Sequence, residues 1–135
     1  MSVPKYDRME SEADFLYFAR VIEMYLKESV RKFDKSDTFT FKVPLCNLAF
    51  DINRNIRRGN SIYPLNQHEA QLRRDFFLTA KGDLEDFVGE WEIAKELIKQ
   101  LDKEMFFDLS DLLKTEIKLL IGIMKKDRER FRNLP

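Results

Sequence analysis

The chain has 135 residues, of which 44% are apolar and 36% charged, as expected for one soluble domain with its own core. Its 24 basic side chains cancel its 24 acidic ones, so net charge alone indicates no nucleic acid, membrane surface or acidic substrate. Four glycines and four prolines exclude a collagenous or low-complexity protein and leave too little turn chemistry for an all-β fold.

A first helix is predicted near residues 11–33, after a tail of residues 1–10. Ser11 and Asp14 form a helix-start pattern that places an acid near the positive helix terminus. Apolar residues then recur at helical steps of three and four: Phe15, Phe18, Ile22, Leu26 and Phe33. The helix therefore presents one face to a core.

A second helix is predicted near residues 44–60. Pro44 fits the first turn of a helix, where its missing N–H is not needed. Gly59, Asn60 and Pro64 are typical of its end. Its apolar side consists of Leu45, Leu48, Ala49, Ile52 and Ile56.

Two longer helices are predicted near residues 66–100 and 102–130. Asn66 with Glu69 begins the third helix, and Asp102 begins the fourth. At helical rise, the third helix would be about 50 Å long, which favours an elongated bundle. The apolar positions are Leu72, Phe76, Ala80, Leu84, Phe87, Trp91, Ala94, Ile98 and Leu101, then Phe106, Leu109, Leu113, Ile117, Leu120 and Met124.

The short links between these helices predict the architecture. A link of a few residues forces two consecutive helices to lie antiparallel. We therefore expect one domain over residues 1–135, an all-α, up-down-up-down antiparallel four-helix bundle.

A second stripe on the third helix does not fit a plain monomeric bundle. Gly82 and Gly89 lie inside the helix, where each is about 1 kcal/mol less favourable than alanine. With Leu78 and Ile93 they form a stripe displaced from the main apolar face. The stripe is either an interface between subunits or the second buried face of a central helix, and the sequence leaves both interpretations open.

The charges are distributed unevenly along the chain. Residues 1–52, 53–81, 82–116 and 117–135 carry net charges of −1, +4, −7 and +4. In the predicted bundle both basic blocks meet at one end, and arginine suits bidentate contacts with phosphate or carboxylate groups. The candidate residues for nucleic-acid or partner binding are Arg54, Arg57, Arg58, Arg73, Arg74, Lys125, Lys126, Arg128, Arg130 and Arg132. Alternatively, these side chains are solvated and complement a helix dipole.

Residues typical of catalysis are scarce. His68 is the only histidine, and Cys46 lies among apolar neighbours with no sequence sign of an activating partner. The sequence has no phosphate-binding glycine loop, nucleophile elbow or paired-cysteine spacing. We expect no enzyme activity, cofactor, metal or small-molecule substrate. The lone cysteine and the absence of a signal peptide or membrane span predict a cytoplasmic protein.

Two segments resemble motifs of a known protein family. Residues 51–59, DINRNIRRG, resemble the pattern Ser-Ile-Pro-x-Asn-Ile-x-Glu-Gly at Ile52, Asn55, Ile56 and Gly59. Residues 77–86, FLTAKGDLED, resemble Phe-Leu-x-x-Ala-x-Gly-Ser-Leu-x-Glu. Both patterns occur in the four-helix-bundle proteins encoded in 23S ribosomal RNA intervening sequences and in their relatives, the accessory variability determinant (Avd) proteins of diversity-generating retroelements.

Two further motifs resemble the Avd branch. Residues 34–40 are similar to Pro-Lys-x-x-Arg-Phe-Thr at Lys35, Phe39 and Thr40, and a Glu-Ile-Gly-x-x-Leu-Gly pattern is seen in Glu116, Ile117 and Gly122. The resemblance implies a cyclic homo-oligomer, a pentameric barrel, with no catalytic residue. In the Avd branch it further implies binding of RNA or DNA and of a reverse transcriptase; the alternative is a scaffold that binds only protein.

Overall fold

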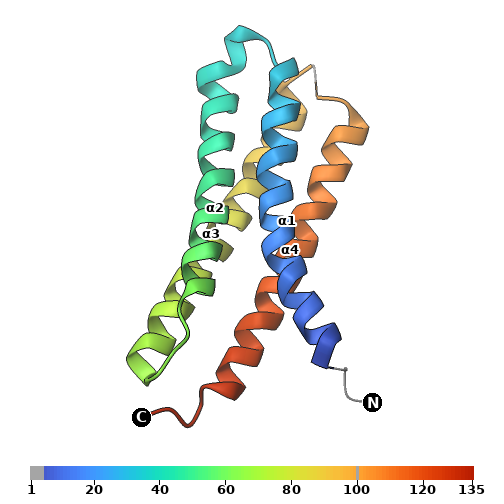
Figure 1. The fold of residues 1–135 in the computed structure, drawn as a ribbon. Coiled ribbons are helices and arrows are strands. Elements are labelled where there is room, and N and C mark those ends of the chain that lie inside the picture. Colours follow the sequence, from blue (N-terminus) through green and yellow to red (C-terminus); the bar gives the residue numbers. More distant parts are fainter. Residues whose placement is uncertain (1–4, 100) are drawn as a thin grey trace.

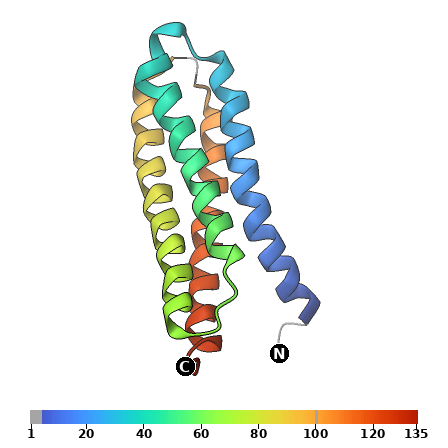
Figure 2. The ribbon, with the colours of Figure 1, turned by 60° about the vertical axis from the view of Figure 1, so that its left-hand side comes forward.

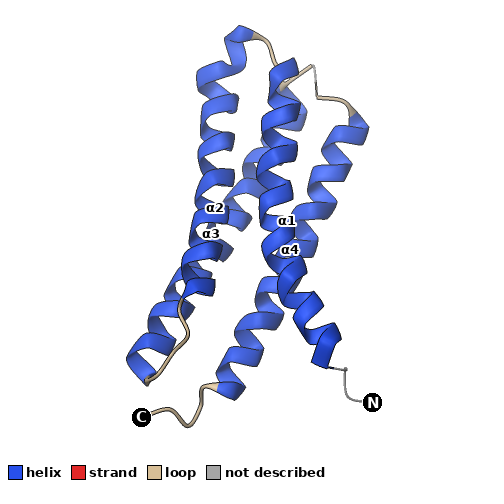
Figure 3. Ribbon diagram, viewed as in Figure 1, coloured by secondary structure: helices blue, strands red, loops and turns tan. Residues whose placement is uncertain are grey.

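The computed structural model describes residues 5–99 and 101–135, with side chains from residue 14 onward. Across these residues the chain forms helices and connecting segments and no strand, and four long helices pack together (Figures 1 and 3). The predicted all-helical fold of four packed helices is confirmed. The helices are α1 (Lys5–Ser29), α2 (Val43–Ser61), α3 (Gln67–Leu97) and α4 (Lys103–Arg130).

The start of α1 differs from the expected one. The helix begins at Lys5 instead of near Ser11, and residues 1–4 of the expected tail lie outside the described part of the chain. No glycine or proline interrupts residues 5–29, so the helix continues through the Ser11–Asp14 pattern. At the other end, Val30–Lys32 forms a 3₁₀ turn that covers most of the remaining expected length.

The connection between α1 and α2 has local structure that no periodicity predicts. Lys35–Asp37 forms a 3₁₀ turn, and Thr38–Lys42 forms a π-helical turn that leads directly into α2. Phe41 is buried beneath this turn and contributes to the core, whereas Phe39 is exposed. The helix α2 then covers the expected 44–60 with one residue more at each end.

Side-chain caps begin the two long helices where the sequence places them. The Asn66 side chain accepts the N–H of Glu69 at 2.9 Å, and the Asp102 side chain accepts the N–H of Met105 at 2.7 Å. Such caps each contribute about 1 kcal/mol by satisfying an otherwise unpaired N–H. At its end α3 is shorter than expected, since it stops at Leu97, and residue 100 lies outside the described residues.

The core runs along the length of the four helices. Phe15 of α1 and Phe77 of α3 make an edge-to-face contact with ring centroids 5.6 Å apart. Trp91 of α3 stacks on Phe106 of α4 at 6.0 Å and donates its indole N–H to the Phe106 carbonyl at 3.1 Å. Trp91 is therefore a packing residue of the core.

Residues of the two quoted motifs meet between α2 and α3. A Cβ at Gly59 would lie 2.5 Å from the Phe77 ring, so the helices approach where only glycine fits. About one helical turn further along α2, the buried Asn55 amide donates to the Asp83 carboxylate at 3.2 Å, while burial raises the Asp83 pKa. These motif residues thus hold α2 against α3.

Candidate nucleic-acid interface

The start of α3 and the end of α4 lie together at one end of the molecule, beside the connection between α2 and α3 (Figures 1 and 2). The Gln67 side chain donates to the carbonyls of Phe131 at 2.9 Å and Arg132 at 3.2 Å. The Gln67 backbone N–H donates to the Pro135 carbonyl at 2.9 Å. Segments from both basic blocks of the sequence therefore meet at this end, which we call the basic end.

Arg73 is buried at the basic end, with 7% of its surface exposed. Its Nε donates to the Asp127 carboxylate at 2.7 Å, and its Nη1 donates to the carbonyls of Gly59 at 3.3 Å and Ile62 at 3.1 Å. Its guanidinium also lies 4.9 Å from the centre of the Phe77 ring. The expectation that Arg73 contacts a partner is therefore wrong; it ties α2, α3 and α4 together.

Three of the other predicted arginines line one hollow. Arg74 from α3, Arg128 from the end of α4 and Arg132 from the turn that follows α4 border a cavity of about 430 Å³. The Phe131 ring and the amides of Gln67 and Gln71 complete much of its wall. The two amides already donate within the chain, Gln67 to the C-terminal carbonyls and Gln71 to Asp75 at 2.8 Å, and Asp127 also lines the hollow. The guanidinium groups and the aromatic ring are the parts suited to a phosphate with an attached base.

Acidic residues offset part of this positive charge. Asp127 pairs with Arg130 at 2.7 Å as well as with Arg73, and Glu129 pairs with Arg132 at 3.4 Å. The Arg130 guanidinium also lies over Phe131 at 4.9 Å. Arg128, Lys125 and Lys126 are exposed on the last turns of α4. The basic end keeps a positive surplus that is smaller than its count of arginines suggests.

The arginines of α2 do not all join this hollow. Arg54 pairs with Asp51 at 3.1 Å and lies over the Phe50 ring at 5.6 Å. Arg57 lines a different groove, between α1 and α2. Arg58, in the last turn of α2, is exposed over the Phe76 ring at 6.0 Å. The expected single patch of ten basic residues is thus divided among several places.

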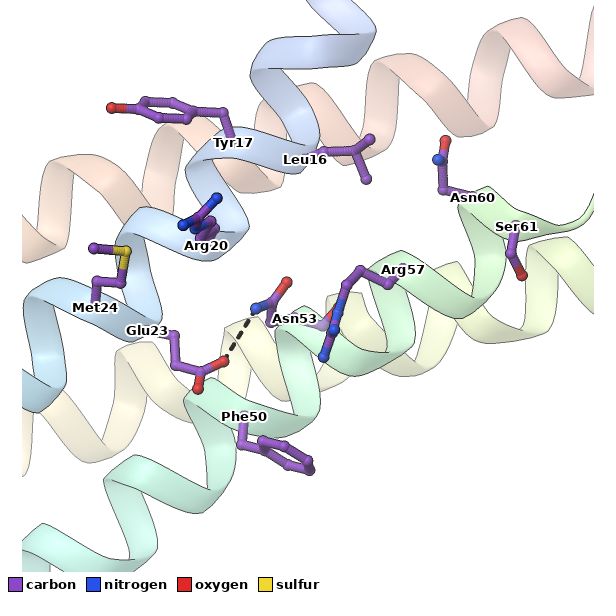
Figure 4. Close-up of a pocket in the computed structure, with 10 residues that line it drawn as sticks. All are labelled: Leu16, Tyr17, Arg20, Glu23, Met24, Phe50, Asn53, Arg57, Asn60 and Ser61. Carbon is purple, nitrogen blue, oxygen red and sulfur yellow. Dashed lines mark hydrogen bonds between the residues drawn. The ribbon is translucent and has the colours of Figure 1, made fainter.

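The groove between α1 and α2 has a volume of about 770 Å³ (Figure 4). A hydrogen bond of 3.1 Å from the Asn53 amide to the Glu23 carboxylate crosses between the two helices. Lys27 pairs with Glu23 at 2.6 Å, and these partners lower the Glu23 pKa despite its partial burial. The residues that line the groove are Leu16, Tyr17, Arg20, Glu23, Met24, Phe50, Asn53, Arg57, Asn60 and Ser61.

The predicted interface stripe on α3 faces outward. Leu78 is 43% exposed and Ile93 48%, and a Cβ at Gly82 or Gly89 would meet no atom of the rest of the described chain within 4 Å. The interpretation that this stripe is a second buried face of a central helix is therefore wrong. The stripe is continued by Leu97, which is also exposed.

Sequence reasoning missed several residues near these surfaces. Tyr63 and Leu65 protrude from the α2–α3 connection, with Tyr63 82% exposed. The signal was available, because an aromatic and a leucine on either side of Pro64 lie outside every helical period. Arg20 was missed because the groove forms only when α1 and α2 pack together.

The remaining polar candidates have ordinary surroundings. His68 is exposed in the first turn of α3. Cys46 is half-buried against the core, and burial raises the pKa of its thiol, which keeps it protonated at neutral pH.

None of the helices in residues 5–99 and 101–135 has the length and apolar character to span a bilayer. No known protein-family model matches this chain, and no curated protein matches it either.

Proposed function

We propose that the protein is a non-catalytic, oligomeric helical adaptor of the cytoplasm that binds nucleic acid, a reverse transcriptase or both through its basic end. The binding surface would be built around the hollow of Arg74, Arg128 and Arg132, with Arg58, Lys125 and Lys126 extending the positive region. The hollow itself carries the proposal, because it gathers guanidinium groups from two helices around an aromatic ring. Arginine forks bind phosphate in a bidentate manner, and a ring can stack on a neighbouring base.

The proposed adaptor is an up-down-up-down bundle. Cross-helix pairs support this topology, because a rising residue number on one helix meets a falling number on the next. Trp91 contacts Phe106 near one end of α3, whereas Arg73 contacts Asp127 near the other. The ribbon views also support helices that alternate in direction along the chain (Figures 1 and 2).

The assembly would be a cyclic homo-oligomer, which we propose to be a pentamer in line with the family resemblance. The outward stripe of Leu78, Gly82, Gly89 and Ile93 supports self-association, since it leaves apolar side chains and bare backbone open to a neighbour. Several copies of a weak basic end would gain avidity without new contacts. Substituting Gly82→Leu and Gly89→Leu is expected to lower the assembled mass in light scattering while helicity by circular dichroism persists.

The nucleic-acid role can be tested by neutralising the hollow. Arg74→Gln combined with Arg128→Gln is expected to weaken binding of a 20-nucleotide single-stranded RNA at least tenfold, because each lost phosphate contact removes counterion release. The slope of log affinity against log salt should become shallower by about 0.7 for each lost contact with a single strand. Fluorescence anisotropy between 50 and 200 mM salt measures both effects.

A matched control is available on α4. Lys114→Gln with Lys118→Gln removes the same charge from exposed positions outside the hollow, and it should leave RNA binding nearly unchanged. Equal losses in both variants, or RNA binding by the wild type that ignores salt, would contradict a specific phosphate site at the basic end.

The alternative function is a scaffold that binds only protein. The pairing of Asp127 and Glu129 with arginines of the basic end favours it, because these carboxylates offset charge that a phosphate would otherwise neutralise. On this alternative the wild type binds neither RNA nor DNA at 50 mM salt, while a protein partner is still captured.

A further inference from the structure

Two surfaces of this chain both expose apolar side chains and carry opposite charge. One is the α1–α2 groove, and the other is the outer face of α3, which we define as Leu78, Gly82, Asp86, Gly89, Ile93 and Leu97. These positions follow one another at steps of four, four, three, four and four, so they lie in one line along the helix.

The groove offers apolar contact together with unbalanced positive charge. Tyr17, Met24 and Phe50 are exposed apolar side chains on its border, and Leu16 packs against the core beneath. Its one carboxylate, Glu23, is already paired with Lys27. Arg20 from α1 and Arg57 from α2 supply the remaining charges, one from each wall (Figure 4). The groove therefore fits an apolar helix that carries acids.

The outer face of α3 has those properties. Between Gly82 and Leu97 the helix carries six acids and a single lysine, Lys95. Asp86 lies on the outer line, and the exposed Glu90 and Glu96 lie beside it. The two glycines leave the backbone open, so another surface could approach closely. This helix face is acidic, apolar and narrow, so it complements the positively charged, apolar groove.

The two surfaces cannot meet within one molecule. The outer line of α3 lies on the opposite side of this helix from its buried line of Phe77, Ala80, Leu84, Phe87, Trp91 and Ala94. The groove lies between two other helices of the same bundle, α1 and α2. Contact between unlike surfaces of identical chains is heterologous, and it produces a closed ring or a filament.

We propose that the α1–α2 groove of one copy receives the outer face of α3 from a second copy of this chain. Arg20 and Arg57 would face Asp86 and Glu90 of the neighbour, which lie one turn apart on α3, while Tyr17, Met24 and Phe50 would pack on the exposed apolar side chains of that face. This inference rests on the self-association in the proposed function and names the two surfaces that carry it. Charge complementarity sets the register of the contact, and the apolar side chains supply burial.

The test is reversal of charge on each side separately and then on both. Arg20→Glu with Arg57→Glu, and separately Asp86→Arg with Glu90→Arg, should each reduce the assembled mass toward that of a single 16.2 kDa chain in sedimentation equilibrium. The variant that carries all four reversals should regain the wild-type mass, because opposite charges again face each other. All reversed positions are on the surface, and circular dichroism checks that each variant stays helical.

Lys114→Glu with Lys118→Glu is the matched control, since it changes the charge as much as the groove variant on another exposed face. It should keep the wild-type mass. The proposal is overturned if the wild type is a single chain, if the groove variant keeps the wild-type mass, or if the fourfold variant is helical but does not reassemble. A different outcome separates the two proposals. If the Gly82→Leu and Gly89→Leu variant loses mass but the Arg20→Glu and Arg57→Glu variant keeps the wild-type mass, the groove is rejected and the proposed self-association stands.

Discussion

Arg73 at the basic end and Glu116 in the middle of α4 are both buried ionisable residues, yet the protein accommodates them in opposite ways. Arg73 has a carboxylate partner, two backbone carbonyl acceptors and an aromatic ring around its guanidinium. Both carboxyl oxygens of Glu116 lack a hydrogen-bond partner among the described residues, and burial raises its pKa to about 9. A buried charge persists where partners replace water, whereas an isolated carboxyl keeps its proton.

This contrast assigns different roles to the two regions. The Arg73 network joins α2, α3 and α4, so it fixes the position of the hollow that we propose as the binding surface. Glu116 lies on the buried side of α4 between Leu113 and Leu120 and joins no such network. We therefore expect substitutions at the basic end to change stability near pH 5 more than a neutral substitution of Glu116 does.

The largest effect is expected for Arg73→Met. Removing the guanidinium leaves Asp127 without its shortest cross-helix partner and the carbonyls of Gly59 and Ile62 without this donor. Breaking a buried pair from one side costs about 3 kcal/mol or more. Urea unfolding followed by circular dichroism measures the loss. Arg74→Met, at the half-buried neighbouring position, should cost less than about 1 kcal/mol; equal losses would contradict the anchoring role of Arg73.

A smaller effect is expected where α2 meets α3 beside that network. Gly59→Ala places a Cβ 2.5 Å from the Phe77 ring, which is itself buried and stacked beneath Arg73. Such overpacking costs about 1 to 3 kcal/mol in the free energy of unfolding. Gly122→Ala is the control, because a Cβ there meets no described atom within 4 Å beyond its own helix and should stabilise α4 slightly. If thermal unfolding shows Gly59→Ala to be more stable than Gly122→Ala, the Phe77 ring moves aside without a cost in stability.

Much of the fold could be predicted from periodicity, whereas much of the site could not. The caps at Asn66 and Asp102, the apolar lines of α2 and α4 and that of α3 from Ala80 onward are local patterns, so the sequence reveals them directly. At the start of α3 the prediction was wrong, because Leu72 is exposed and Phe77 is buried in place of Phe76. The start of α1 was misplaced because Ser11 and Asp14 resemble a cap but lie in an uninterrupted helix. Local patterns therefore identify helices better than they place a helix end.

The site depends on which side of a helix each arginine occupies. Arg73 and Arg74 are adjacent in sequence, but about 100° of rotation on a helix separates a buried anchor from a residue that lines the hollow. Counting basic residues could not distinguish them, because the partner that buries Arg73 is Asp127, 54 positions away. For Glu116 a signal existed, since its spacing from Leu113 and Leu120 places it on the buried side of α4.

At a fixed pH near 5 the smallest expected effect is that of Glu116→Gln, which mainly changes how stability depends on pH. The Glu116 pKa is about 9 in the folded chain, against an ordinary value of 4.5 that applies when the chain is unfolded. Between these values the unfolded chain loses this proton while the folded chain keeps it, so the free energy of unfolding falls as pH rises. The slope from this group is at most about 1.4 kcal/mol per pH unit. Glu116→Gln removes this contribution. In urea unfolding between pH 5 and 8, the free energy of unfolding should therefore fall more steeply with pH for the wild type than for the variant.

The exposed Glu92 provides the matched control for this measurement. Glu92→Gln deletes the same titrating group where water solvates it, so its stability curve should run parallel to that of the wild type. If the Glu116→Gln curve is also parallel to the wild type, the carboxyl must ionise in the folded chain near its ordinary pKa. Glu116 would then have a charged partner or water, and its contrast with Arg73 would disappear.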